Sequence, residues 1–312
     1  MTEYALEIEQ VVDDDLLPLD KAVTIVVPAY NEAAHVAEQI VNVDRVMRTS
    51  GWEYEIIVVD DGSTDGTAEA ANEPGLARVV RRVQNRGYGA ALKLGVRLAS
   101  HPWILITDAD GTYPVEAIPL LLARSETNSM VVGARTGEVV KVPFVRRPAK
   151  WFLNRLASYL AARDLPDINS GLRLMRKSLI NRYEHLLPDG FSFTTTITLS
   201  SACNSHPLEY VPIDYHARLG QSKIRPRHAY DFTLLIVRTI VFFNPLKVFV
   251  PIAGFLSVVG AIKFLYDLFR IGNLSETAVL CLLGAVIIGS VGLLADQNSR
   301  IALTPEPFED RH

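Results

Sequence analysis

The chain has 312 residues, of which 49% are hydrophobic, and this composition excludes a mainly disordered protein. Its net charge is −4, and we find no basic, aromatic-interleaved surface of the kind that follows a nucleic-acid backbone, so we expect no nucleic-acid partner. The two cysteines, Cys203 and Cys281, lack metal-ligand spacing and indicate a reducing compartment. Hydrophobic residues concentrate near the end of the chain, which predicts a soluble part followed by a membrane-bound part.

Residues 1–20 are acidic and contain neither the basic start nor the apolar stretch of a signal peptide, so we expect an N-terminal extension and a cytoplasmic catalytic part. Ordered structure should begin at the continuous β-branched run 22–30, which is typical of a buried parallel strand. A helix should follow over 32–48, then a second buried strand over 54–63. The next helix, 64–72, should be capped by Thr64 or Asp65.

The alternation continues with strands near 77–83, 103–110 and 129–135 and helices near 87–99 and 114–124. This order predicts an α/β fold with a doubly wound, mostly parallel sheet. Ligands bind at the carboxyl edge of such sheets, so polar residues that end the strands should share one site. The first strand is followed by no G-x-G-x-x-G motif, and the chain has no P-loop, so neither site type is supported.

The sharpest feature is the pair Asp108 and Asp110, which follows the apolar run 103–107. Two carboxylates so close repel each other unless a cation lies between them, and Mg²⁺ or Mn²⁺ prefers carboxylates together with the oxygens of a diphosphate. The alternative is a pair of solvated turn residues ahead of Pro114.

After residue 140 we expect mainly helices. The segment 143–165 combines basic and aromatic residues as an amphipathic helix, which could lie at a membrane interface or pack as an ordinary surface helix.

Two apolar stretches, 248–269 and 277–295, are each long enough to cross a bilayer, although a pair of buried core helices is the alternative. Lys263 and Asp267 interrupt the first stretch near its end and could pair at i,i+4 spacing. Basic residues precede the first stretch and follow the second, whereas the connector carries only Arg270. This distribution predicts that both chain ends lie in the cytoplasm.

Four successive motifs, VVPAYNEAAHV, IIVVDDGSTDGT, NRGYGAALKLGV and ILITDADGTYP, resemble the signatures of family 2 glycosyltransferases with the GT-A fold. Further along, DINSGLRLMRKSLI and HARLGQSKI, followed by two membrane spans, resemble the polyprenyl-phosphate branch, the dolichol-phosphate mannose synthase group. The motifs cover about residues 22–225. The resemblance implies a GT-A catalytic domain over 21–224, a juxtamembrane segment 225–247, the two spans, and a cytoplasmic tail 296–312.

The resemblance also implies roles for the rim residues. Pro28, Tyr30 and Glu32 match the motif that holds the nucleotide, and Asp61, with Asp60 beside it, matches the acid that accepts a hydrogen bond from the base. Asp108 and Asp110 match the D-x-D motif that binds Mg²⁺ or Mn²⁺. Some relatives have a third ligand, glutamine, where this chain has Thr112, so the cation should depend more on substrate and water.

Further resemblances concern the phosphates and the acceptor. Arg135 matches an arginine facing the phosphates, while Asp167 should orient the acceptor. A cationic loop that should bind the nucleotide sugar is matched by Arg218, Ser222 and Lys223. An element that should bind the acceptor is matched by Ser170, Gly171 and Arg173. Asp110, Arg135, Asp167 and Arg218 form the catalytic group that the resemblance implies. Thr194 and Thr195 stand where relatives often have an acid, so no catalytic carboxylate is assigned there.

The implied reaction is an inverting transfer of a sugar from a UDP- or GDP-sugar to a membrane polyprenyl phosphate, by a protein that could form homo-oligomers. Two alternatives stay open. A processive polysaccharide synthase of the same fold would carry a Q-x-x-R-W element, which is absent from this sequence. A non-catalytic membrane scaffold would not need Asp61, Asp108, Asp110, Arg135 and Arg218, all of which are present.

Overall fold

The computed structural model describes residues 20–136, 155–215, 234–270 and 275–303, with short gaps at 156, 160, 162, 235–236 and 239–240. The described residues divide into two compact units. The first contains 20–136, 166–197 and 205–215, and the second contains 155–165, 198–204 and the residues from 234 onward.

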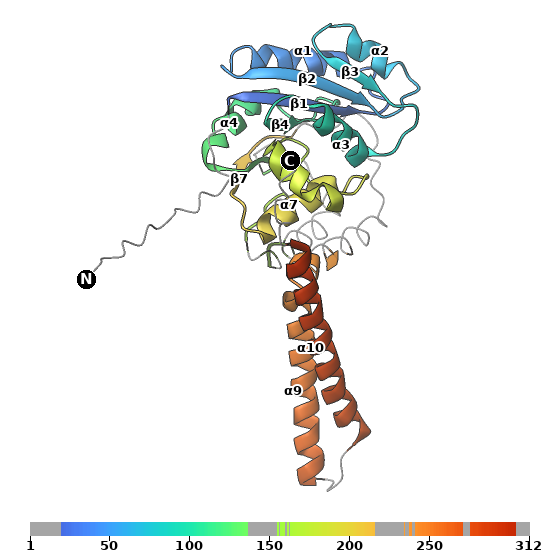
Figure 1. Ribbon diagram of the computed structural model, residues 1–312, viewed down its shortest axis with the longest axis vertical. Coiled ribbons are helices and arrows are strands. Elements are labelled where there is room, and N and C mark those ends of the chain that lie inside the picture. Colours follow the sequence, from blue (N-terminus) through green and yellow to red (C-terminus); the bar gives the residue numbers. More distant parts are fainter. Residues whose placement is uncertain are drawn as a thin grey trace, which may run out of the picture. The chain divides into compact units, whose positions relative to one another are not determined.

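The first unit is built on a sheet with the strand order β3-β2-β1-β4-β6-β5-β7 (Figure 1). All neighbouring strands are parallel except β6, which runs antiparallel to both β4 and β5. The mostly parallel α/β sheet that the sequence predicts is therefore confirmed. The strands are β1 (Ala22–Ala29), β2 (Glu53–Asp60), β3 (Arg78–Arg81), β4 (Trp103–Ile106), β5 (Met130–Ala134), β6 (Arg173–Arg176) and β7 (Leu208–Pro212).

Helices cover both faces of the sheet. On one face α1 (Val36–Met47) packs with α2 (Thr67–Asn72) and α4 (Ile118–Leu122) over the main apolar core, and on the other face α3 (Tyr88–Leu98) packs on β1 and β2 (Figure 1). The remaining elements of this unit are η2 (Val115–Ala117), η3 (Ser125–Thr127), α6 (Lys177–Tyr183) and η5 (Glu184–Leu186), and α7 (Phe193–Cys203) begins in it.

The first strands agree with the sequence prediction because their composition leaves few alternatives. Every residue of β1 is buried, as expected for a continuous β-branched run between two layers of helices. The predicted cap of α2 is wrong, because Gly66, in the left-handed conformation, precedes the helix. Asp65 lies one residue before Gly66, and its carboxylate accepts a hydrogen bond from the backbone N–H of Thr67 at 3.1 Å.

The prediction of mainly helices after residue 140 is wrong for the two strands β6 and β7. β6 is buried throughout, yet it begins and ends with an arginine, and this pattern is atypical of a central strand. Arg173 and Arg176 are nevertheless only 0% and 2% exposed. β4 also ends earlier than predicted, at Ile106, so the two acids of the D-x-D motif lie in the following loop.

The predicted amphipathic helix 143–165 lies largely outside the described residues. Within it, residues 155, 157–159 and 161 are helical, and Ala157 and Ala161 are buried while Tyr159 is 66% exposed. An amphipathic character is thus present in the described turn, and its relation to a membrane stays a prediction.

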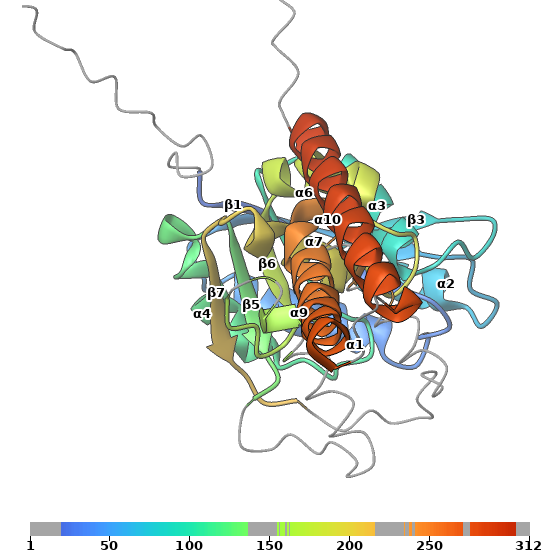
Figure 2. The ribbon, with the colours of Figure 1, turned by 90° about the horizontal axis from the view of Figure 1, so that it is seen from below.

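The second unit contains a helical hairpin formed by α9 (Leu246–Arg270) and α10 (Glu276–Leu303), which lie side by side in both views (Figures 1 and 2). The most apolar windows of α9 and α10 have mean hydropathies of 2.1 and 2.6, and both helices are long enough to cross a membrane. Large apolar side chains such as Phe255 and Phe269 are exposed, by 68% and 81%, which is unlike the buried core helices of the alternative interpretation.

Polar side chains close the hairpin at the end of α9. Lys263 and Asp267 form the predicted i,i+4 ion pair at 2.6 Å, and Asp267 also accepts hydrogen bonds from the backbone and hydroxyl of Ser275. The Ser275 hydroxyl in turn accepts from the backbone N–H of Ala278, in the first turn of α10. Asp267 therefore connects the end of one apolar helix to the start of the next.

Candidate active site

The loops that follow β1, β2 and β4 lie at one edge of the sheet. β1 pairs with β2 along its whole length, so that Ala29 lies beside Asp60, and β4 flanks β1 on the other side. All three strands are parallel, so their carboxyl ends meet. The structure thereby brings together Tyr30 and Glu32, the two acids Asp60 and Asp61, and the D-x-D loop.

The loops after β1 and β2 hold each other through hydrogen bonds. Asn31 has a left-handed backbone with φ of 55°; its N–H donates to the Ser63 hydroxyl at 2.9 Å, and its side-chain oxygen accepts from the N–H of Thr64 at 3.0 Å. The N–H of Glu32 donates to the Thr67 hydroxyl at 2.9 Å. These contacts fix the loop that carries Tyr30 and Glu32.

Asp65 adds a charged contact between the same two loops. Its carboxylate accepts from the N–H of Ala33 at 3.1 Å and from the hydroxyl of Thr67. Burial on its own would raise the pKa of Asp65, but the hydrogen bonds from Thr67 and Ala33 outweigh it, and the pKa lies below its ordinary value. The sequence reasoning missed these supporting residues, although hydroxyl and amide side chains gathered around two strand ends are the signal for such contacts.

Asp60 and Asp61 are both buried, with exposures of 0% and 3%. Asp60 accepts from the N–H of Ser63 at 2.9 Å. Asp61 accepts from the Arg82 guanidinium at 3.2 Å and from the backbone N–H of Gly87 at 2.7 Å, with the Arg86 N–H shared between its two oxygens. The Asp61 carboxylate therefore fastens the loop before α3 to the end of β2, and each of its oxygens accepts two hydrogen-bond contacts.

The two acids of the D-x-D motif have different surroundings. Asp110 accepts from the backbone N–H of Thr112 at 3.2 Å and from its hydroxyl at 2.7 Å, so Thr112 orients this acid. Asp108 accepts at Oδ1 from the Tyr88 hydroxyl at 3.1 Å. Ala109 between them is buried, whereas both acids are partly exposed. The backbone turn therefore directs both carboxylates away from the core.

The residues fit a divalent cation. Both acids supply hard oxygen atoms, and a Cβ added to Gly171 would lie 2.9 and 3.0 Å from the two carboxylate oxygens of Asp108, so this close approach needs glycine. Among the residues that the structure describes, no group of three or more His, Cys, Asp or Glu side chains is placed to hold a metal. Asp108 and Asp110 would hold the cation, and the rest of its coordination shell would come from substrate and water.

Arg135 and Asp167 form a bidentate ion pair, although they are 32 positions apart. Nε and one terminal nitrogen of Arg135 lie 2.8 and 2.9 Å from the Asp167 oxygens, and the Arg135 N–H donates to the same carboxylate at 3.1 Å. The Tyr215 ring lies 5.4 Å from the guanidinium. Burial alone would lower the pKa of Arg135, but Tyr113 and Asp167 outweigh it and raise the pKa, so the side chain stays charged.

The acceptor-binding element of the sequence analysis lies mostly inside the protein. Ser170 is buried and donates to the carbonyl of Gly133, and the N–H of Gly171 donates to the Tyr113 hydroxyl at 2.6 Å. Arg173 is fully buried, which lowers its pKa, and it donates to the backbone carbonyls of Ser170 and Thr194. These two side chains shape the loop from within, and the expectation that Ser170 and Arg173 bind the acceptor stays a prediction.

Two tyrosines link these parts of the site and were not selected from the sequence. Burial raises the pKa of Tyr88 and Tyr113, so both hydroxyls stay protonated at neutral pH. Tyr88 contacts Asp108, and Tyr113 contacts Gly171 and packs edge-on against Tyr215 at 5.3 Å. The predicted cationic loop, Arg218, Ser222 and Lys223, lies outside the described residues.

Residues 24–184 match glycosyl transferase family 2, and residues 244–301 match the GtrB C-terminal hairpin. The chain belongs to glycosyl transferase family 2 and is a glycosyltransferase. The D-x-D acids lie in the region that matches family 2, at the edge of the sheet where the ends of β1, β2 and β4 meet. The helices α9 and α10 lie in the region that matches the C-terminal hairpin.

Named relatives support a narrower group. The dolichyl-phosphate hexose transferase of Haloferax volcanii is 31% identical over 228 residues, covering 72% of this chain and 90% of that protein. The dolichol-phosphate mannosyltransferase of Pyrococcus furiosus is 28% identical over 271 residues, covering 83% and 75%. The undecaprenyl-phosphate 4-deoxy-4-formamido-L-arabinose transferase of Klebsiella pneumoniae is 33% identical over 170 residues, covering 53% and 51%. The resemblance to the polyprenyl-phosphate branch is confirmed.

Solved structures confirm the fold. Glucosyl-3-phosphoglycerate synthase from Mycobacterium tuberculosis, in a complex with Mn²⁺, UDP-glucose and phosphoglyceric acid, has a TM-score of 0.56 at 22% identity and covers 70% of this chain and 79% of its own. Mannosyl-3-phosphoglycerate synthase from Rubrobacter xylanophilus has a TM-score of 0.53 at 21% identity, covering 71% and 72%. The sheet is thus of the GT-A type.

Proposed function

We propose that the protein transfers a sugar from a nucleoside-diphosphate sugar to a polyprenyl phosphate in the membrane. The observation that carries this proposal is the combination, in one chain, of partly exposed Asp108 and Asp110 at the sheet edge with an apolar hairpin. The three relatives described above are named for transfer to dolichyl or undecaprenyl phosphate, which supports the choice of acceptor. The sugar and the nucleotide base are left open within this class.

The donor would bind at the edge formed by β1, β2 and β4. Pro28, Tyr30 and Glu32 would contact the nucleoside, and Asp61 would accept from an N–H of the base in place of one branch of the hydrogen bond that the Arg86 N–H shares between its oxygens, with Asp60 holding the loop behind it. A divalent cation on Asp108 and Asp110, Mg²⁺ or Mn²⁺, would neutralise the diphosphate and so make it a better leaving group. Arg218, Ser222 and Lys223 are proposed to close over the same phosphates.

The acceptor phosphate would attack the anomeric carbon from the side opposite the leaving diphosphate, and one displacement inverts the configuration. A phosphate is already an anion at neutral pH, so the reaction needs positioning and charge neutralisation more than a strong base. Arg135, held by Asp167, keeps a fixed positive charge for this task. Since Asp167 is fully engaged by Arg135, its proposed role is to position that arginine, with Gly171 lining the acceptor side.

The proposed arrangement in the membrane follows from the charge pattern and the hairpin. The catalytic domain, 21–224, and both chain ends would be cytoplasmic, with the juxtamembrane segment 225–247 leading into the first span and the tail 296–312 leaving the second. The segment 143–165 would lie at the interface, where the lipid acceptor enters. Association of hairpins into homo-oligomers is compatible with their exposed apolar side chains.

The product itself provides the test of this proposal. Purified protein with Mn²⁺, a polyprenyl phosphate and an accepted donor should give one sugar linked to the lipid phosphate, and NMR should show the anomeric configuration opposite to that of the donor. Retention of configuration would contradict a single displacement. Asp110→Asn should abolish transfer with an unchanged unfolding temperature, and near-normal turnover by that variant would remove the cation from this site.

A further inference from the structure

Tyr88 lies between the cation site and a neighbouring loop. It is the first residue of α3, and its hydroxyl donates to Oδ1 of Asp108, which follows β4. A hydrogen bond at one oxygen restricts rotation of the Asp108 carboxylate about its Cβ–Cγ bond. Gly171 also lies close to this carboxylate, because a Cβ at this position would be only 2.9 Å from Oδ2 and 3.0 Å from Oδ1 of Asp108. The two contacts together give Asp108 one orientation.

The segment 184–191 packs closely against the start of α3. A Cβ on Gly89 would lie 2.1 Å from the carbonyl oxygen of Pro188, and one on Gly87 would lie 2.5 Å from that of Asp189. The N–H of Ala90 donates to the Asp189 carbonyl at 3.0 Å. The glycines on both sides of Tyr88 therefore allow a backbone contact that no other residue would permit.

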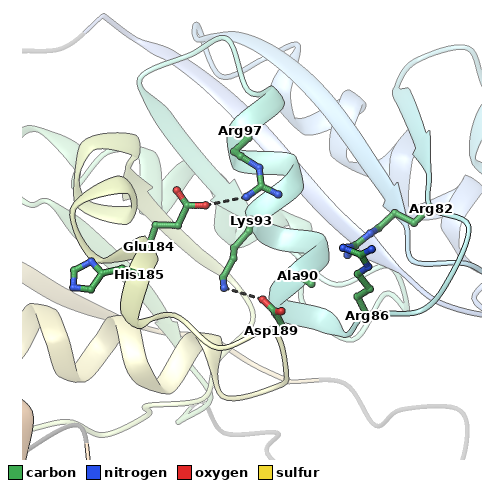
Figure 3. Close-up of a pocket in the computed structure, with 8 residues that line it drawn as sticks. All are labelled: Arg82, Arg86, Ala90, Lys93, Arg97, Glu184, His185 and Asp189. Carbon is green, nitrogen blue, oxygen red and sulfur yellow. Dashed lines mark hydrogen bonds and ion pairs between the residues drawn. The ribbon is translucent and has the colours of Figure 1, made fainter.

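Two ion pairs fasten the same segment to the exposed face of α3 (Figure 3). Lys93 pairs with Asp189 at 2.8 Å, and Arg97 pairs with Glu184 at 3.0 Å. They border a polar cavity of about 410 Å³. Because the acids of the segment already neutralise Lys93 and Arg97, we interpret this face of α3 as the place where segment 184–191 is held against the helix.

The ring of Tyr88 is held by a second aromatic residue. Phe191, at the end of the segment, stacks on it with a centroid separation of 5.8 Å and an interplanar angle of 17°. Phe191 itself is 68% exposed. The stacking of this ring on Tyr88 restricts the motion of the Tyr88 side chain.

We propose that Tyr88 is a positioning residue for the cation site: its hydroxyl holds the Asp108 carboxylate in the orientation that receives the divalent cation, and segment 184–191 holds Tyr88. This inference rests on the proposed function, because it assigns the D-x-D acids to a cation. Tyr88 does not contact substrate in this scheme. Removing its hydroxyl should weaken cation binding and leave the chemical step intact once the site is filled.

The test measures Mn²⁺ binding directly. Full-length protein in detergent, saturated with UDP or GDP, is titrated with Mn²⁺ while the free ion is followed by electron paramagnetic resonance. Tyr88→Phe keeps the ring and its stacking, and should raise the Kd for Mn²⁺ about fivefold to tenfold, which is the size of one ordinary net hydrogen bond. The Mn²⁺ concentration for half-maximal transfer should rise in the same proportion, with kcat at saturating Mn²⁺ within about twofold of wild type.

A matched control separates this role from a general loss of a buried hydroxyl. Tyr183→Phe removes a hydroxyl that pairs with His206 Nε2 at 2.8 Å, and it should leave Mn²⁺ binding unchanged. Phe191→Ala keeps the Tyr88 hydroxyl but removes its support, and should raise the Kd about twofold to threefold. Because Phe191 is exposed, this variant should fold even if Tyr88→Phe does not.

The outcomes distinguish the inference from the proposed function. Unchanged Mn²⁺ affinity in Tyr88→Phe, or in Phe191→Ala if Tyr88→Phe does not fold, would overturn the inference, as would an equal loss in Tyr183→Phe. Wild-type protein that binds Mn²⁺ with the nucleotide, loses affinity in Tyr88→Phe, and transfers no sugar to any lipid phosphate would support the inference and overturn the proposed function.

Discussion

The ion pair between Arg135 and Asp167 makes a strong prediction about stability. Asp167 is 1% exposed and accepts from three donors of Arg135 and from the N–H of Asn169. In Asp167→Asn the charge is lost, and the new amide N–H₂ group faces the guanidinium donors. Two charge-assisted hydrogen bonds at about 1.5–3 kcal/mol each imply a loss of roughly 3–5 kcal/mol, similar to the cost of breaking a buried ion pair.

For a domain of about 150–250 residues, this loss lowers the unfolding temperature by about 6–20 °C. Tryptophan fluorescence of the detergent-solubilised protein measures the transition, and Asp164→Asn is the control, because Asp164 is exposed three positions earlier. An Asp167→Asn variant as stable as wild type would refute the structural assignment of Asp167. Full stability with lost transfer would return Asp167 to the direct acceptor role that the sequence resemblance implies.

Other predictions concern the loops and the cation. Gly89→Ala should lower the free energy of unfolding by about 1–3 kcal/mol, because its Cβ would overlap the Pro188 carbonyl, whereas Gly190→Ala, with nothing within 4 Å, should have little effect; equal thermal shifts would contradict the close contact. The pKa of Asp65 is lowered on folding, so its stabilisation is present above the ordinary value of 3.8 and is lost as the pH falls through the folded pKa. The unfolding temperature of wild type should therefore approach that of Asp65→Asn below about pH 4, and a constant difference down to pH 2 would exclude this linkage. Removal of divalent ions with EDTA should abolish sugar transfer, and added Mn²⁺ or Mg²⁺ should restore it; undiminished turnover in EDTA would argue against a cation on Asp108 and Asp110.

The first part of the sheet was predictable because its signals are local. β1 and β2 are continuous β-branched runs, and the helices between the early strands show apolar spacing that buries one face, as in α1. The two apolar helices of the hairpin were predictable for the same reason, since their length and hydropathy are visible in the sequence. The ends of parallel strands then had to meet at one edge, which placed the polar loops together.

The strands β6 and β7 were not predictable by the same means. β6 is four residues long with a buried arginine at each end: Arg173 donates to the backbone carbonyls of Ser170 and Thr194, and the guanidinium of Arg176 lies 5.2 Å from the Trp103 ring. Its place between β4 and β5 depends on pairing between segments far apart in the chain. Strand pairing of this kind is a tertiary property that local pattern does not contain.

Local sequence pattern also limits what can be predicted about the candidate active site. The acids of the D-x-D motif were found because two adjacent carboxylates at a strand end have few structural explanations. The pairing of Arg135 with Asp167 was not found, because each matched a separate motif and only the fold shows that they neutralise each other. Tyr88 falls in the predicted helix near 87–99, and its contact with Asp108 depends on where α3 begins relative to the loop that follows β4.

The central claim is that this protein moves a sugar onto a polyprenyl phosphate. The most direct measurement incubates the full-length protein in detergent with Mn²⁺, a polyprenyl phosphate and a panel of radiolabelled UDP- and GDP-sugars, and then counts the label that partitions into the organic phase. We expect that at least one donor labels the lipid, that the label is released as a single sugar by mild acid, and that Asp110→Asn leaves the organic phase unlabelled. No label in the lipid from any donor, or label only in a polymer, would contradict it.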